Sequence, residues 1–160
     1  MAAQRGVYTV AFFAGAFTTA NGDYDFFELT PVDDRPIEIV AVYLGVKTEV
    51  GDAQDEMIDV TIVTDNATTG NGATTTPRPL DPRDGAAGFT AESVASTTAT
   101  TGTEVLLHAD TFNVRAGWQI IFPEFMRPKA DQADVMLCIR LETALADDAT
   151  ISGTVYVREL

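Results

Sequence analysis

The chain has few of the residues from which catalytic and metal-binding sites are usually built. Its 160 residues include one cysteine, one histidine and one tryptophan. A single cysteine, Cys138, excludes an intrachain disulfide and a thiolate metal cluster, and its place in the apolar run 135–139 favours a buried small hydrophobe. His108 alone cannot supply a multi-histidine metal site, and no serine or cysteine motif accompanies it. We therefore expect no catalytic residue, no metal and no cofactor, and a protein that is not an enzyme.

Basic residues are also scarce. Ten Lys and Arg stand against 24 Asp and Glu, for a formal net charge of -14. Nucleic-acid binding and docking on anionic membranes both need clustered basic residues, so we expect neither. No apolar run approaches the ~20 residues of a membrane-spanning helix. We interpret the apolar patch near the N-terminus as the first strand of the fold, with a cleaved signal peptide as the alternative.

Helical periodicity of useful length is missing, and alternation with period two takes its place. The pattern is clearest over residues 58–62, 135–142 and 151–158. Apolar residues occupy both faces of the further candidate strands at 6–13, 24–29, 37–46, 104–108 and 118–122. The alternation predicts a core that includes Ile58, Val60, Ile62, Val135, Leu137, Ile139, Val155 and Val157.

Eight or nine short strands separated by turn residues predict an all-β protein with a single antiparallel β-sandwich domain over residues 1–160. A jelly roll fits this strand count best. An immunoglobulin-type sandwich is the alternative, although the cysteine pair that would support it is absent. The strands that are apolar on both faces need cover, above all around Phe12, Phe13, Phe26 and Phe27, which predicts a homo-oligomer.

One long segment, residues 65–102, interrupts this pattern and is predicted to be a loop. Only Leu80, Phe89 and Val94 offer sizeable apolar side chains in it. Structureless loops beyond ~12–15 residues are uncommon in compact domains and are usually functional or disordered. We therefore expect a neighbouring subunit or another partner to hold this segment.

Two stretches, 76–83 (TPRPLDPR) and 122–129 (FPEFMRPK), combine prolines with arginine and large apolar side chains. Proline stiffens an extended backbone and lowers the entropy lost on docking, and arginine suits interface ion pairs. Rigid turns are the plainer interpretation of both stretches. The predicted interface residues are Pro77, Arg78, Pro79, Leu80, Phe89, Arg127 and Pro128.

The acidic run 51–56 offers oxygen atoms that calcium could use, together with Asp33 or Asp34. Its spacing is not that of an EF-hand. We interpret the run as a solvated connection between strands and predict no metal site there.

Several stretches resemble small structural proteins encoded by tailed bacteriophages. They are residues 4–10 (QRGVYTV), 43–45 (YLG), 50–53 (VGDA), 77–81 (PRPLD), 88–92 (GFTAE), 112–115 (FNVR) and 152–157 (SGTVYV). The resemblance implies a capsid decoration, or cement, protein that binds the outer surface of the major capsid protein, commonly as a homotrimer. It implies a location on the exterior of the virion, which suits the acidic charge.

Two other classes of function stay open. A carbohydrate- or receptor-binding module of the virion would need exposed aromatic side chains, for which Trp118, Tyr24 and Tyr156 are the material; a buried Trp118 would leave it without a platform. An enzyme would need a concave site with converging polar groups, and a hydrogen bond from His108 to Asp110 or Glu104 inside a deep pocket would favour it.

Overall fold

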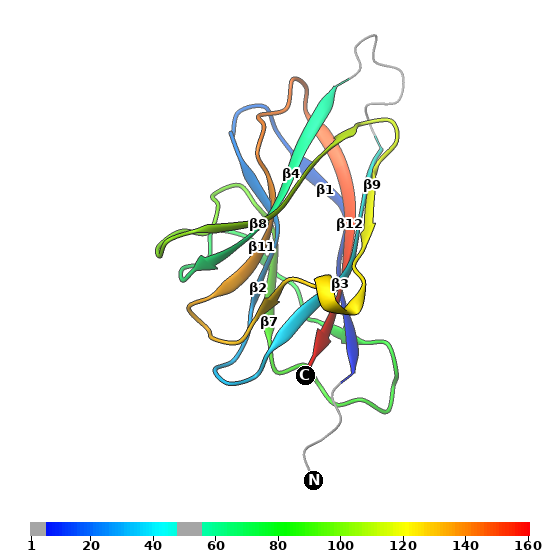
Figure 1. Cartoon of the computed structure of the whole chain (residues 1–160). Coiled ribbons are helices and arrows are strands. Elements are labelled where there is room, and N and C mark those ends of the chain that lie inside the picture. The colour runs from blue at the N-terminus through cyan, green and yellow to red at the C-terminus, as the bar shows by residue number, and fades with distance from the viewer. Residues whose placement is uncertain (1–5, 48–55) are drawn as a thin grey trace.

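The computed structural model describes residues 6–47 and 56–160 and consists of two packed antiparallel β-sheets, which confirms the predicted all-β sandwich (Figure 1). The elements are β1 (Val7–Phe17), β2 (Tyr24–Thr30), β3 (Ile37–Val46), β4 (Met57–Asn66), β5 (Ala73–Thr74), β6 (Arg78–Pro79), β7 (Thr90–Ala95), β8 (Val105–Asn113), β9 (Trp118–Ile121), a 3-10 turn η1 (Glu124–Met126), β10 (Lys129–Ala130), β11 (Met136–Leu141) and β12 (Ala149–Glu159).

The chain crosses repeatedly between the two sheets, although β4 and β5, β7 and β8, and β9 and β10 are consecutive strands of one sheet. The first sheet has the order β10-β3-β12-β1-β6, with β9 paired to β3 beside β10. The second sheet has the order β5-β7-β2-β11-β4-β8. The first and last long strands are neighbours, since β1 pairs with β12 from Val7 opposite Arg158 to Phe17 opposite Ala149. Sequence-distant strands thus form both sheets.

The core lies between the sheets and follows the predicted alternation. Of the eight core residues that the sequence predicts, all are buried except Val135, which is partly buried and packs against the others. Aromatic rings fill one part of this core. Phe17 contacts both Tyr24 and Phe26, and Phe12 contacts Phe27 at a centroid distance of 5.2 Å.

The segment 65–102 is not a loop throughout, because it contains β5, β6 and β7. β7 pairs with β2 at one edge of the second sheet, and β6 pairs with Thr9 and Tyr8 of β1 at one edge of the first. The segment therefore covers the side of the sandwich where β1 and β2 lie. The expectation that a partner must hold it is wrong, since backbone pairing within the chain does so.

Buried polar groups fix the same segment on the outer face of the second sheet. The backbone N–H of Ala99 donates to Asp25 Oδ2 at 2.7 Å, and that of Gly70 donates to both carboxyl oxygens of Glu28. Arg140 donates to Asp25 and, on its other side, to Glu104. These contacts explain why polar residues of β2 and β11 are buried.

The four phenylalanines that were expected to need cover from another subunit have different environments. Phe26 and Phe27 are fully buried within the chain, and Phe12 is partly buried against the core. Phe13 is 88% exposed. For three of the four, the chain itself supplies the cover, so they do not argue for an oligomer.

Candidate interaction surfaces

No metal-binding cluster emerges from residues 6–47 and 56–160. No group of three or more His, Cys, Asp or Glu side chains is placed there to hold a metal ion. Burial raises the pKa of the Cys138 thiol, which keeps it protonated and unreactive. The acidic run considered for calcium lies, apart from Glu56, outside the described residues. In the described part of the chain, no helix is long and apolar enough to cross a membrane.

The predicted interface residues of the first proline stretch lie on and beside β6. Arg78 and Leu80 are exposed, while Pro77 and Pro79 are half-buried. The backbone N–H of Leu80 donates to the carbonyl of Val7, which fixes the stretch on β1. This part of the prediction therefore corresponds to an accessible, ordered surface.

Phe89 does not belong to that surface. Its side chain is only 2% exposed and packs edge-to-face on Tyr8 at a centroid distance of 5.8 Å. A side chain that fills its own domain's core cannot enter a partner's pocket, so the interface role predicted for Phe89 is wrong.

Arg127 and Pro128 lie at the other edge of the first sheet. Arg127 donates to Glu38 at 2.6 Å, and the carbonyl of Pro128 accepts from Ile39. Burial alone would raise the pKa of Glu38, but hydrogen bonds from Arg127 and Lys129 outweigh it and lower that pKa. Arg127 thus neutralises a buried carboxylate of its own chain, and Pro128 is buried. Three strands, β3, β12 and β1, separate these residues from β6, so the two proline stretches do not form one site.

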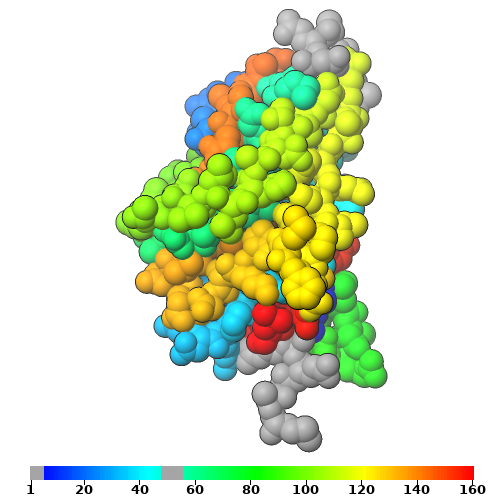
Figure 2. Space-filling model, in the orientation of Figure 1, coloured from blue at the N-terminus to red at the C-terminus, as the bar shows by residue number. Residues whose placement is uncertain are grey.

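The most apolar accessible surface is one that the sequence did not single out. β8 is the last strand of the second sheet and begins with Val105, Leu106 and Leu107, all exposed. Across the open side of the sandwich, Phe125 and Met126 of η1 are 98% and 68% exposed. β8 and the segment 118–130 lie side by side on the face shown in Figure 2. We name Leu107, Phe125 and Met126, which line one pocket, the edge surface.

A pocket of about 360 Å³ opens within the edge surface, lined by Leu107, Phe125 and Met126. Thr64 and His108 also line it, and their atoms Oγ1 and Nε2 are buried with no hydrogen-bond partner among the described residues. Leaving a buried polar group unsatisfied costs about 1–3 kcal/mol. A partner side chain that entered this pocket would cover the apolar surface of Leu107, Phe125 and Met126.

In the described part of the chain, His108 forms no hydrogen bond with Asp110 or Glu104. Its ring packs against Phe122 and Trp118, at centroid distances of 5.6 and 6.2 Å. Asp110 accepts instead from Trp118 Nε1 at 3.0 Å. Trp118 itself is only 7% exposed, and Tyr24 is buried as well. Two of the three aromatic residues that a sugar platform was expected to use are therefore inaccessible.

No protein-family model matches the chain, and neither a curated protein nor a solved structure matches it. The surfaces above therefore carry the functional argument.

Proposed function

We propose that this protein is a non-catalytic structural protein that binds the outside of a bacteriophage capsid and stabilises it. The observation that carries the proposal is the edge surface, a cluster of exposed apolar side chains on a strongly acidic chain. Monomeric soluble proteins rarely leave large apolar patches uncovered, and such patches mark binding surfaces. The resemblance of the sequence to phage structural proteins supplies the partner, the major capsid protein.

The chemistry of the edge surface fits a protein partner. The outer edge of β8 pairs with no other strand in residues 6–47 and 56–160, so its backbone N–H and C=O groups are available to an added strand. No Lys, Arg or Pro, the residues that discourage such pairing, occurs in β8. An extended apolar segment of the capsid protein could pair with β8 and place one side chain in the pocket beside Thr64.

A jelly roll is the finer fold that we propose. Its support is the strand order β1-β12-β3-β9 facing β2-β11-β4-β8, eight strands whose connections run from sheet to sheet except between β4 and β8. This arrangement is what two interlocked Greek keys require. Jelly rolls are frequent in viral capsid proteins, which agrees with the proposed role.

The charge of the chain supports a location on the exterior of the virion. At a formal net charge of -14, the protein would be repelled by packaged DNA.

The homotrimer implied by the resemblance is part of the proposal. Light scattering of the purified protein tests it, and a monomeric mass at micromolar concentration would contradict it.

Co-sedimentation with empty capsids of the phage that encodes the chain tests the capsid proposal. We expect the wild type to sediment with capsids, and Phe125→Ala with Met126→Ala to weaken binding at least about tenfold, because apolar burial at the contact is lost. Leu80→Ala, which removes an exposed apolar side chain at the opposite edge of the first sheet, is the matched control.

Failure of the wild type to bind capsids would contradict the function. Unchanged binding of the double variant would contradict the edge surface. Loss of binding in Leu80→Ala instead would assign the contact to residues 76–83.

A further inference from the structure

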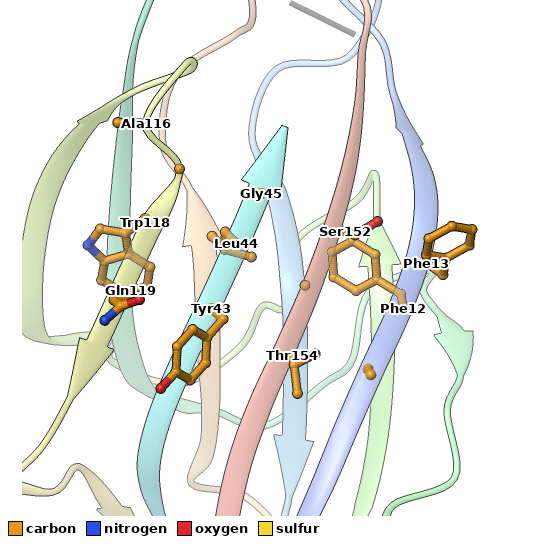
Figure 3. Close-up of a pocket in the computed structure, with 13 residues that line it drawn as sticks. Phe12, Phe13, Tyr43, Leu44, Gly45, Ala116, Trp118, Gln119, Ser152 and Thr154 are labelled. Carbon is orange, nitrogen blue, oxygen red and sulfur yellow. The ribbon is translucent and has the colours of Figure 1, made fainter. Parts of the chain in front are cut away.

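A second accessible hollow lies on the outer face of the first sheet and belongs to neither proline stretch nor the edge surface. It has a volume of about 710 Å³ and crosses four adjacent strands, β9, β3, β12 and β1. Figure 3 shows Tyr43 and Gln119 on one side of it, Phe13 on the other, and Ser152 and Thr154 between them. We name this hollow the sheet groove.

The floor of the sheet groove is open because the residues there are small. Gly45 pairs with Ser152, and a Cβ atom added at Gly45 would meet nothing within 4 Å. The neighbouring row runs from Gln119 through Tyr43 to Thr154, three directly paired residues. An amide and two hydroxyl groups therefore follow one another across the strands, next to the open space above Gly45.

The sheet groove carries no charge. None of the 13 residues that line it is acidic or basic, although 21% of the chain is charged. An anionic ligand would find no cation there and a metal ion would find no carboxylate. The lining instead combines aromatic and aliphatic surface with neutral hydrogen-bonding groups, which is the chemistry of a site for an uncharged ligand.

Phe13 is held at the rim by a strained piece of backbone. The pairing of β1 with β12 shifts register between Phe12 and Gly15, and Ala14 within this bulge has a φ of 54°. The backbone N–H of Ala14 donates to Ser152 Oγ at 2.9 Å. A left-handed non-glycine residue costs about 1–2 kcal/mol, and bulges re-aim side chains next to binding sites. In this protein the bulge contains Phe13, whose side chain is 88% exposed.

We propose that the sheet groove binds a neutral oligosaccharide. A sugar ring presents an apolar C–H face, which stacks on Phe13 or Tyr43, and hydroxyl groups, which exchange hydrogen bonds with Thr154 and Gln119. The hydroxyl of Ser152 accepts from Ala14 and keeps its own hydrogen to donate to the ligand. This site is separate from the edge surface, so the protein binds capsid and glycan through different faces.

Binding to an array of immobilised neutral and acidic oligosaccharides, followed by calorimetric titration of the best neutral one, tests the proposal. We expect the full-length wild type to bind neutral members and Phe13→Ala to weaken binding about tenfold, since the stacking partner is removed. Gly45→Phe should abolish binding by filling the floor, with little change in thermal stability, because Gly45 is exposed and a Cβ atom added there meets nothing within 4 Å.

Phe125→Ala is the matched control, since it removes a phenylalanine of similar exposure, 98% against 88% for Phe13, from a different surface. It should bind the oligosaccharide as the wild type does. Absence of glycan binding by the wild type, preference for acidic glycans, or binding that survives both Phe13→Ala and Gly45→Phe would each overturn the proposal. None of these results depends on capsid binding, so the two proposals fail separately.

Discussion

Arg140 donates from Nε to Asp25 Oδ1 at 2.7 Å, and both side chains are buried beneath the segment 97–104. Burial alone would lower the pKa of Arg140, but the hydrogen bonds and charges of Asp25 and Glu104 outweigh it and raise that pKa. The pair joins β2 and β11 to a segment that has little apolar surface of its own.

We expect Arg140→Ala to lower the free energy of unfolding by about 3–5 kcal/mol, because it leaves the Asp25 carboxylate buried without its cation. Urea denaturation measures the change. Arg83→Ala breaks an ion pair with Asp81 that is exposed to solvent and should leave stability unchanged. Equal effects of the two substitutions would contradict the role given to Asp25 and Arg140.

The raised pKa of Glu28 should make the stability of the protein depend on pH in an unusual direction. Burial, with a hydrogen bond to Asp25, raises the pKa of Glu28 from 4.5 to about 8. Between these values the folded state keeps a proton that the unfolded chain has lost, so stability falls as pH rises from 4.5 to 8. The loss is on the order of 3 kcal/mol.

Urea denaturation at pH 5 and pH 8 measures this loss, and Glu28→Gln should largely remove it, because the amide does not ionise. The side chain of Gln can still accept from the N–H of Gly70. If the variant kept the wild-type slope, another group would carry the effect.

Substitutions at Phe89 and Leu80 should have very different effects on stability, because one side chain is buried and the other is exposed within the same segment, 65–102. Phe89→Ala empties space in the core beside Tyr8 and should cost about 3–5 kcal/mol. Leu80→Ala acts on an exposed side chain and should change stability by no more than about 0.5 kcal/mol. Chemical denaturation of the two single variants checks both values, and similar costs would mean that the segment is packed differently.

Gly102 should tolerate no side chain. Its φ is 93°, and an added Cβ atom would lie 2.1 Å from the carbonyl oxygen of Asp65. Gly102→Ala should cost about 1–3 kcal/mol of stability. Gly22→Ala, where a Cβ atom would meet nothing within 4 Å, is the control and should be nearly neutral in thermal unfolding.

The strands with one apolar face were predictable because their burial follows from local alternation. The burial pattern of residues 58–62 and 151–157 could be predicted without knowing which strands pair with them. β7 was missed because its buried positions, Ala91, Ser93 and Ala95, are small or polar and become interior only through pairing with β2. Phe26 and Phe27 were misjudged for a related reason, since their cover comes from distant parts of the same chain.

The candidate site was only partly predictable. The sequence did single out the stretch 122–129, but it did so because of Arg127 and Pro128. Both of these residues make contacts within their own chain instead of with a partner. The exposure of Phe125 and Met126 depends on where η1 lies in the fold. A three-residue turn has no periodic pattern from which that exposure could be predicted. The edge surface is completed by β8, whose outer side is left unpaired only by the order of strands in the sheet.

The pairing of β1 with β12 sets when the protein can fold during its synthesis. Residues 7–17 reach their main partner only after residues 149–159 have been made. Until then β1, with its phenylalanines, lacks the neighbour that separates it from β3, and the first sheet cannot close. The first sheet therefore stays incomplete until β12 has emerged from the ribosome, and sequestration of early apolar strands by chaperones would raise the yield of folded protein.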